Sequence, residues 1–82
     1  MDYKEEFTQL IEENRLDDAR ILLEKHKLYA SEEPFYYGNM GWILNHMERY
    51  QEAEVFLRKG LVYFPEDGWI YSQLQQQGSR GG

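Results

Sequence analysis

The chain has 82 residues and a formal net charge of −6, and 16% of its residues are aromatic. This length predicts one small domain, and the absence of cysteine excludes disulfides, thiolate metal sites and thiol nucleophiles. The excess of carboxylates argues against a nucleic-acid partner, because they would repel its phosphates. No segment approaches the roughly 20 apolar residues that span a membrane, and the acidic N-terminus does not resemble a signal peptide, so we expect a cytoplasmic protein without a membrane partner.

The first 30 residues predict a pair of helices. The apolar residues of the first stretch recur at three- and four-residue spacing, as expected for one stripe of an amphipathic helix: Tyr3, Phe7, Leu10 and Ile11. Asn14 interrupts this spacing, which resumes at Leu16 and continues toward Tyr29. Asp17 and Asp18 suit the positive end of the second helix's dipole. We therefore expect a helical hairpin with a turn near Asn14-Arg15.

Three further helices are predicted, at about residues 34–47, 51–63 and 69–77. The first of these begins where Ser31, a capping residue, is followed by two carboxylates and by Pro34, which a first helical turn tolerates. Residues 64–68 contain a proline and a glycine and break the pattern. Residues 78–82 are rich in glycine and predict a flexible tail.

Gly41 and Gly60 lie among the apolar stripe residues of two predicted helices. A glycine in a helix interior costs roughly 1 kcal/mol relative to alanine. We therefore expect both positions to be sites where another helix approaches closely, because only a missing side chain permits that approach.

The sequence also repeats itself with a period of 34 residues. Arg15-Leu16-Asp17-Asp18-Ala19 returns as Arg49-Tyr50-Gln51-Glu52-Ala53, and tyrosines recur at the same offset. Further pairs with this offset are Leu10 and Leu44, Leu23 and Leu57, and Lys25 and Lys59. A fixed period of this length predicts stacked structural units.

With this period and two helices per unit, the chain resembles the tetratricopeptide repeat family. The best-matching unit, residues 34–67, keeps the family's pattern of large and small residues at these positions: Tyr37, Met40-Gly41, Leu44, Tyr50, Ala53, Leu57, Gly60 and Pro65. The first unit, residues 2–33, is more degenerate, with His26 and Ser31 in place of a small residue and the proline. Residues 68–77 match the opening of a third unit. The resemblance thus covers residues 1–77 as one domain of about two and a half repeats.

The resemblance implies an all-α fold of five helices, arranged as a right-handed stack of antiparallel helical hairpins, an alpha-alpha superhelix. In this family the first helix of each pair lines a concave groove that commonly receives an extended peptide or a partner helix. The family's register assigns these residues to the groove: Lys4, Thr8, Ile11, Phe35, Gly38, Asn39, Trp42, Asn45, His46, Trp69 and Gln73. Trp42 and Trp69 would anchor a ligand while the amides bond its backbone. The alternative is that both indoles only cover the core.

Some members of the family hold the terminal carboxylate of a peptide with a clamp of lysines, asparagines and an arginine. Lys4 and Asn39 occupy two of the clamp positions in this chain, whereas the other three hold Thr8, Trp69 and Gln73. Without the second lysine and the arginine, too little positive charge remains for a carboxylate pair. We therefore do not expect this clamp to operate.

No pattern of residues predicts catalysis, a metal site or a cofactor. His26 and His46 fall on different helices with no third ligand at metal spacing. Adjacent carboxylates lie near helix ends, where solvation and the helix dipole account for them. A set of cations on the second helices, Lys25, Lys27, Arg58 and Lys59, is interspersed with glutamates and predicts a solvated face rather than a binding stripe.

The leading hypothesis is therefore a non-enzymatic interaction module that binds a protein or peptide partner in its groove. One alternative is a structural or engineered repeat fragment that serves folding or assembly, and another is a docking segment of a larger enzyme. Because Trp69, Ile70 and Leu74 alone cover one end of the predicted stack, we also expect either a monomer with a frayed fifth helix or a homodimer through that helix.

Overall fold

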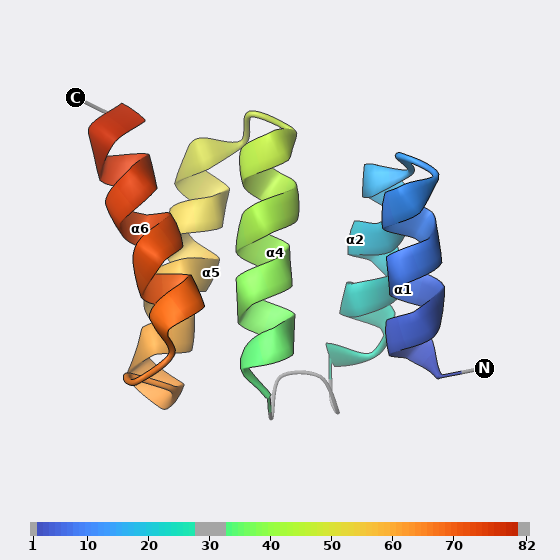
Figure 1. Ribbon diagram of the computed structural model, residues 1–82, viewed down its shortest axis with the longest axis horizontal. Helices are drawn as coiled ribbons and strands as arrows, with labels where there is room; N and C mark the ends of the chain where they lie inside the picture. Colours follow the sequence, from blue (N-terminus) through green and yellow to red (C-terminus); the bar gives the residue numbers. More distant parts are fainter. Residues whose placement is uncertain (1, 28–32, 81–82) are drawn as a thin grey trace.

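The computed structural model describes residues 2–27 and 33–80, and all regular structure in these ranges is helical. Five helices follow one another: α1 (Tyr3–Glu12), α2 (Leu16–Lys25), α4 (Pro34–His46), α5 (Tyr50–Tyr63) and α6 (Gly68–Arg80). They stand side by side, with α1, α4 and α6 running one way and α2 and α5 the other (Figure 1). The contacts between helices are mostly between neighbours in sequence. The expectation of a five-helix, all-α domain is confirmed.

The two hairpin turns have the same backbone geometry. Asn14 and Glu48, which lie 34 residues apart, are the two non-glycine residues with positive φ in the described ranges, at 58° and 61°. In each turn the next residue donates its N–H to a carbonyl five residues earlier, from Arg15 to Leu10 at 2.9 Å and from Arg49 to Leu44 at 2.8 Å. These bonds satisfy carbonyls that would be left unpaired at the helix ends. The sequence period is therefore also a period of the backbone, and the turn predicted near Asn14-Arg15 is confirmed.

Helix α4 lies at the centre of the fold and contacts α2, α5 and α6. Its buried side chains join those of the other helices in one core: Phe7, Ala19, Leu22, Leu23, Tyr36, Tyr37, Met40, Ile43, Leu44, Ala53, Leu57 and Ile70. Contact between α1 and α4 is made by aromatic edges, since the ring of Phe35 lies 5.5 Å from that of Phe7 and 6.0 Å from that of Tyr3. These rings connect α1 to the first turn of α4.

Both glycines that the sequence marked as close-approach sites are confirmed as such. A Cβ atom on Gly41 would lie 2.3 Å from Cδ2 of Leu57, and one on Gly60 would lie 2.7 Å from Cβ of Tyr37. Real Cβ contacts essentially never reach such distances. The absence of a side chain at each position allows α4 and α5 to pack closely.

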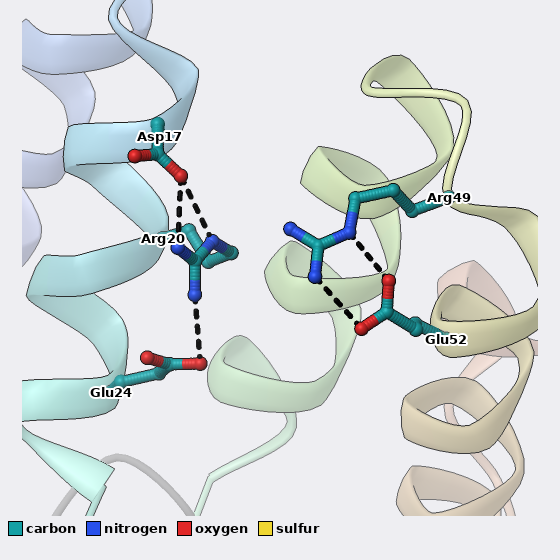
Figure 2. A network of polar contacts seen from close by, with 5 residues as sticks. All are labelled: Asp17, Arg20, Glu24, Arg49 and Glu52. Carbon is teal, nitrogen blue, oxygen red and sulfur yellow. Dashed lines mark hydrogen bonds and ion pairs between the residues drawn. The ribbon is translucent and has the colours of Figure 1, made fainter.

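Charged side chains of α2 and of the start of α5 face each other in front of α4 (Figure 2). Arg20 bonds Asp17 at 2.8 Å and Glu24 at 3.1 Å, and Arg49 bonds Glu52. The hydrogen bond to Glu52 raises the pKa of Arg49, and the charges of Asp17 and Glu24 on the other hairpin add to this increase. Each guanidinium nevertheless bonds within its own hairpin.

Two helix ends differ from the sequence prediction. α2 ends at Lys25, whereas its periodicity continued toward Tyr29, which together with the predicted cap at Ser31 lies outside the described residues. α6 begins where the side chain of Asp67 caps it, accepting the N–H of Ile70 at 2.9 Å. It continues to Arg80, past the start of the predicted flexible tail at residue 78. Glutamine is a good helix former, and one glycine near a terminus costs only about 1 kcal/mol, so this helix is not ended by Gly78.

Candidate functional site

The face formed by α4 and α6 lacks charge in a protein in which 29% of residues are charged. α4 contains no Asp, Glu, Lys or Arg, and α6 contains none before Arg80. α1, which runs parallel to them, contributes Thr8 and Ile11 to the same side of the molecule. The uncharged helices α4 and α6, together with these two residues of α1, form a candidate surface for binding by apolar contact and neutral hydrogen bonds.

Two adjoining pockets lie on this face. The first, here called the indole pocket, has a volume of about 160 Å³ and is lined by Phe7, Thr8, Ile11, Asn39, Trp42 and Trp69. The second, the amide cleft, has a volume of about 220 Å³ and is lined by Trp42, Asn45, His46, Trp69, Ser72, Gln73, Gln76 and Gln77. Trp42 and Trp69 line both pockets, so the two pockets adjoin at the indoles.

The two indoles are held by different neighbours. The ring of Trp42 lies on that of His46, with 3.9 Å between the centroids. Trp69 lies over Gly38, where an added Cβ would come within 2.6 Å of the indole. Trp69 nevertheless keeps 46% of its surface exposed. A large aromatic ring that is partly exposed and packed against a helix backbone is the kind of side chain that anchors a partner.

Gln73 is the buried polar side chain that positions α6 against α4. It is 7% exposed, and its Nε2 donates to the carbonyl oxygen of Gly38 at 3.1 Å. This bond connects residues 35 positions apart and therefore fixes the position of α6 relative to α4. The structure thus gives Gln73 a supporting role within the site.

Asn39 and Thr8 are each bonded within their own helices. Asn39 Nδ2 donates to the carbonyl of Phe35 at 2.9 Å, and the Thr8 hydroxyl donates to that of Lys4 at 3.0 Å. Asn39 retains its Oδ1 and a second N–H for a ligand. Both side chains line the indole pocket, as the sequence reading placed them.

Lys4 lies outside both pockets and is paired. Its ammonium bonds Glu33 and lies 5.0 Å from the centroid of the Phe35 ring. The hydrogen bond to Glu33 raises the pKa of Lys4. Its positive charge is therefore directed to Glu33 instead of toward a ligand in the pockets.

Of the residues that the sequence assigned to the groove, the pockets bring together Thr8, Ile11, Asn39, Trp42, Asn45, His46, Trp69 and Gln73. Lys4, Phe35 and Gly38 are not among the lining residues. The sequence reading missed Phe7, Ser72, Gln76 and Gln77. Of these, Gln77 also donates to the carbonyl of Tyr50 on α5. The helical spacing of Trp69, Gln73, Gln76 and Gln77 was the signal available.

The histidines have aromatic neighbours. His26 stacks on Tyr3 with 4.9 Å between the ring centroids, and His46 lies on Trp42.

Within residues 2–27 and 33–80 no group of three or more His, Cys, Asp or Glu side chains is arranged to hold a metal ion. No described helix combines the length and the apolar character required to cross a membrane.

Comparisons of this chain with models of protein families, with curated proteins and with solved structures find no match. The candidate site therefore stands on its geometry: two indoles, an apolar pocket and an amide-rich cleft.

Proposed function

We propose that this protein is a non-enzymatic interaction module that binds a peptide segment or a partner helix across α1, α4 and α6. The observation that carries the proposal is the pair of adjoining pockets that share Trp42 and Trp69. Their lining comes from three parallel helices that are separated in sequence, so an elongated ligand would cross all three. Partly exposed indoles beside neutral amides favour apolar anchoring combined with hydrogen bonds to a backbone.

The resemblance to the tetratricopeptide repeat supports the same proposal. The 34-residue period recurs in the turn geometry at Asn14 and Glu48, as expected for two units of one repeat. We propose on this basis that the hairpins belong to a right-handed superhelical stack with α1, α4 and α6 on its concave side. The pairing of Lys4 with Glu33 argues further against a clamp for carboxylates.

The test is capture of a partner by the wild-type protein and by three variants, followed by measurement of the affinity of the captured segment as a synthetic peptide. We expect Trp42→Ala and Trp69→Ala to lose the partner. Val62→Ala, which removes a side chain that is 76% exposed on α5, should retain it. Thermal unfolding of each variant separates lost binding from lost folding. A partner that all variants bind equally would refute the groove.

The alternative reading is a structural repeat fragment or a docking segment of a larger enzyme. It predicts that no peptide binds at the two indoles. A homodimer through α6 is the related alternative, and it is favoured by the exposure of Tyr71, which is 54%. Ile70 is fully buried, however, so α6 does cover the end of the core. Sedimentation equilibrium across a wide concentration range would decide between monomer and dimer.

A further inference from the structure

The amide cleft contains two buried oxygen atoms without a hydrogen-bond donor, Asn45 Oδ1 and Gln77 Oε1. The orientation of Gln77 follows from its other contact, because its Nε2 donates to the carbonyl of Tyr50 and a carbonyl can only accept. Buried acceptors are nearly always bonded in folded proteins, so each such oxygen calls for an explanation. Both residues line the same cleft.

His46 adds a third acceptor to this cleft. Its Nδ1 lies 2.9 Å from the carbonyl oxygen of Trp42, which requires that Nδ1 carry the hydrogen. In the neutral ring Nε2 is then left as an acceptor. The lining residues include no Lys or Arg, so the cleft offers acceptors without supplying a cation.

The charge of the surroundings also favours a cation. His46 is the last residue of α4, and the carbonyls at the end of a helix carry a partial negative charge. The protein as a whole has a net charge of −6. Two indoles line the cleft, and the faces of indole rings attract cations. An acidic ligand group would find none of these features favourable.

We propose that the amide cleft receives an arginine side chain of the partner. This inference rests on the proposed function, since it names the chemistry of the segment that the groove binds. A guanidinium supplies five N–H donors in one plane and stacks on aromatic rings, which fits amide oxygens placed beside two indoles. Both oxygens are closed to solvent in the free cleft, and the Gln77 amide is held by its bond to Tyr50. Terminal amide torsions are broad, so rotation of the Asn45 amide turns its oxygen toward the ligand.

The test uses three small probes: N-acetyl-arginine amide, its neutral isostere N-acetyl-citrulline amide, and N-acetyl-glutamate amide. Binding is followed through the indole N–H and side-chain amide signals in proton–nitrogen NMR spectra. We expect the arginine probe to shift the signals of Trp42, Trp69 and Asn45, with an affinity about tenfold or more above those of the other two probes. Citrulline keeps the shape and several donors but lacks the charge.

A pair of variants assigns the effect to the cleft. Asn45→Asp places a carboxylate there and should tighten binding of the arginine probe severalfold. Asn39→Asp places the same charge on the same helix but in the indole pocket, and should tighten it less. Equal binding of arginine and citrulline, or equal effects of the two variants, would overturn the inference.

Failure of this inference is distinguishable from failure of the groove. A partner lost with Trp42→Ala, together with an inert arginine probe, would refute the arginine subsite and leave the groove in place. An arginine probe that binds when no groove partner exists would support the subsite and refute the wider function.

Discussion

The first hairpin buries one residue of its leading helix, Phe7 on α1, whereas the second buries seven residues of α4. The turns are nonetheless the same, and two equivalent pairs of the second helices are fully enclosed, Ala19 with Ala53 and Leu23 with Leu57. The repeated sequence therefore determines the turn and the inner face of each hairpin. The position in the stack determines how much of the leading helix is covered, because α4 has neighbours on more sides than α1.

The residue types at some equivalent positions of the two repeats also differ. Gly41 and Gly60 of the second hairpin correspond to Phe7 and His26 of the first. The two glycines permit α4 and α5 to approach closely, whereas the first hairpin has a large ring and an imidazole at these places. The comparison indicates that the second hairpin is the more tightly packed half of the molecule.

The largest expected effect comes from truncating the same leucine in both hairpins. Leu44 is 2% exposed and Leu10 is partly buried. Leu44→Ala should cost about 2–5 kcal/mol of stability, as for core leucines, and Leu10→Ala about half as much. The free energy of unfolding in denaturant measures both. Equal losses would contradict the claim that stack position sets the burial of the leading helix.

The sequence sufficed for the helices, the turns and the close-approach glycines because these depend on periodicity and on local backbone preferences. The apolar stripe of α1 and the offset from Arg15 to Arg49 were visible without coordinates. The end of α6 could not be predicted from the sequence, because a glycine weakens a helix without necessarily ending it.

The candidate site was predicted in part, and the reason is physical. Trp42, Trp69 and Asn39 followed from the register of the repeat. The pairing of Lys4 with Glu33 and the reach of Gln77 to Tyr50 depend on long side chains crossing between elements, which no local pattern specifies. Such contacts decide the charge of the site and the shape of the amide cleft.

A second prediction concerns Gly41, where the second hairpin has no room for a side chain. Gly41→Leu should destabilise the protein by about 1–3 kcal/mol, because Leu57 is fully buried and cannot move aside without overpacking. The matched control on α5 is Glu54→Ala, which removes only an exposed ion pair with Arg58 and should change stability by less than about 1 kcal/mol. Thermal unfolding midpoints compare the two. Similar shifts would show that Gly41 is not a packing site.

A third prediction exchanges the turn residues between the hairpins. Both Asn14 and Glu48 have positive φ, a conformation that asparagine adopts more readily than glutamate. Glu48→Asn should therefore stabilise the protein and Asn14→Glu destabilise it, each by up to about 1 kcal/mol. Denaturant midpoints at pH 7 provide the measurement. Shifts of the same sign for the two variants would mean that the turns are not equivalent.

The smallest expected effect concerns the ion pair between Arg49 and Glu52 at the start of α5. The hydrogen bond from Arg49 lowers the pKa of Glu52, so the folded protein holds this carboxylate ionised at a lower pH than the unfolded chain does. The resulting stabilisation is present above the ordinary pKa, near 4.5, and disappears as the pH falls through the lowered value. Glu52→Gln should thus be slightly less stable than wild type at pH 7 and equally stable at pH 2. Because both groups are exposed, 1 M salt should also remove most of the difference. A difference that is unchanged at low pH would show that Glu52 acts through packing and not through its charge.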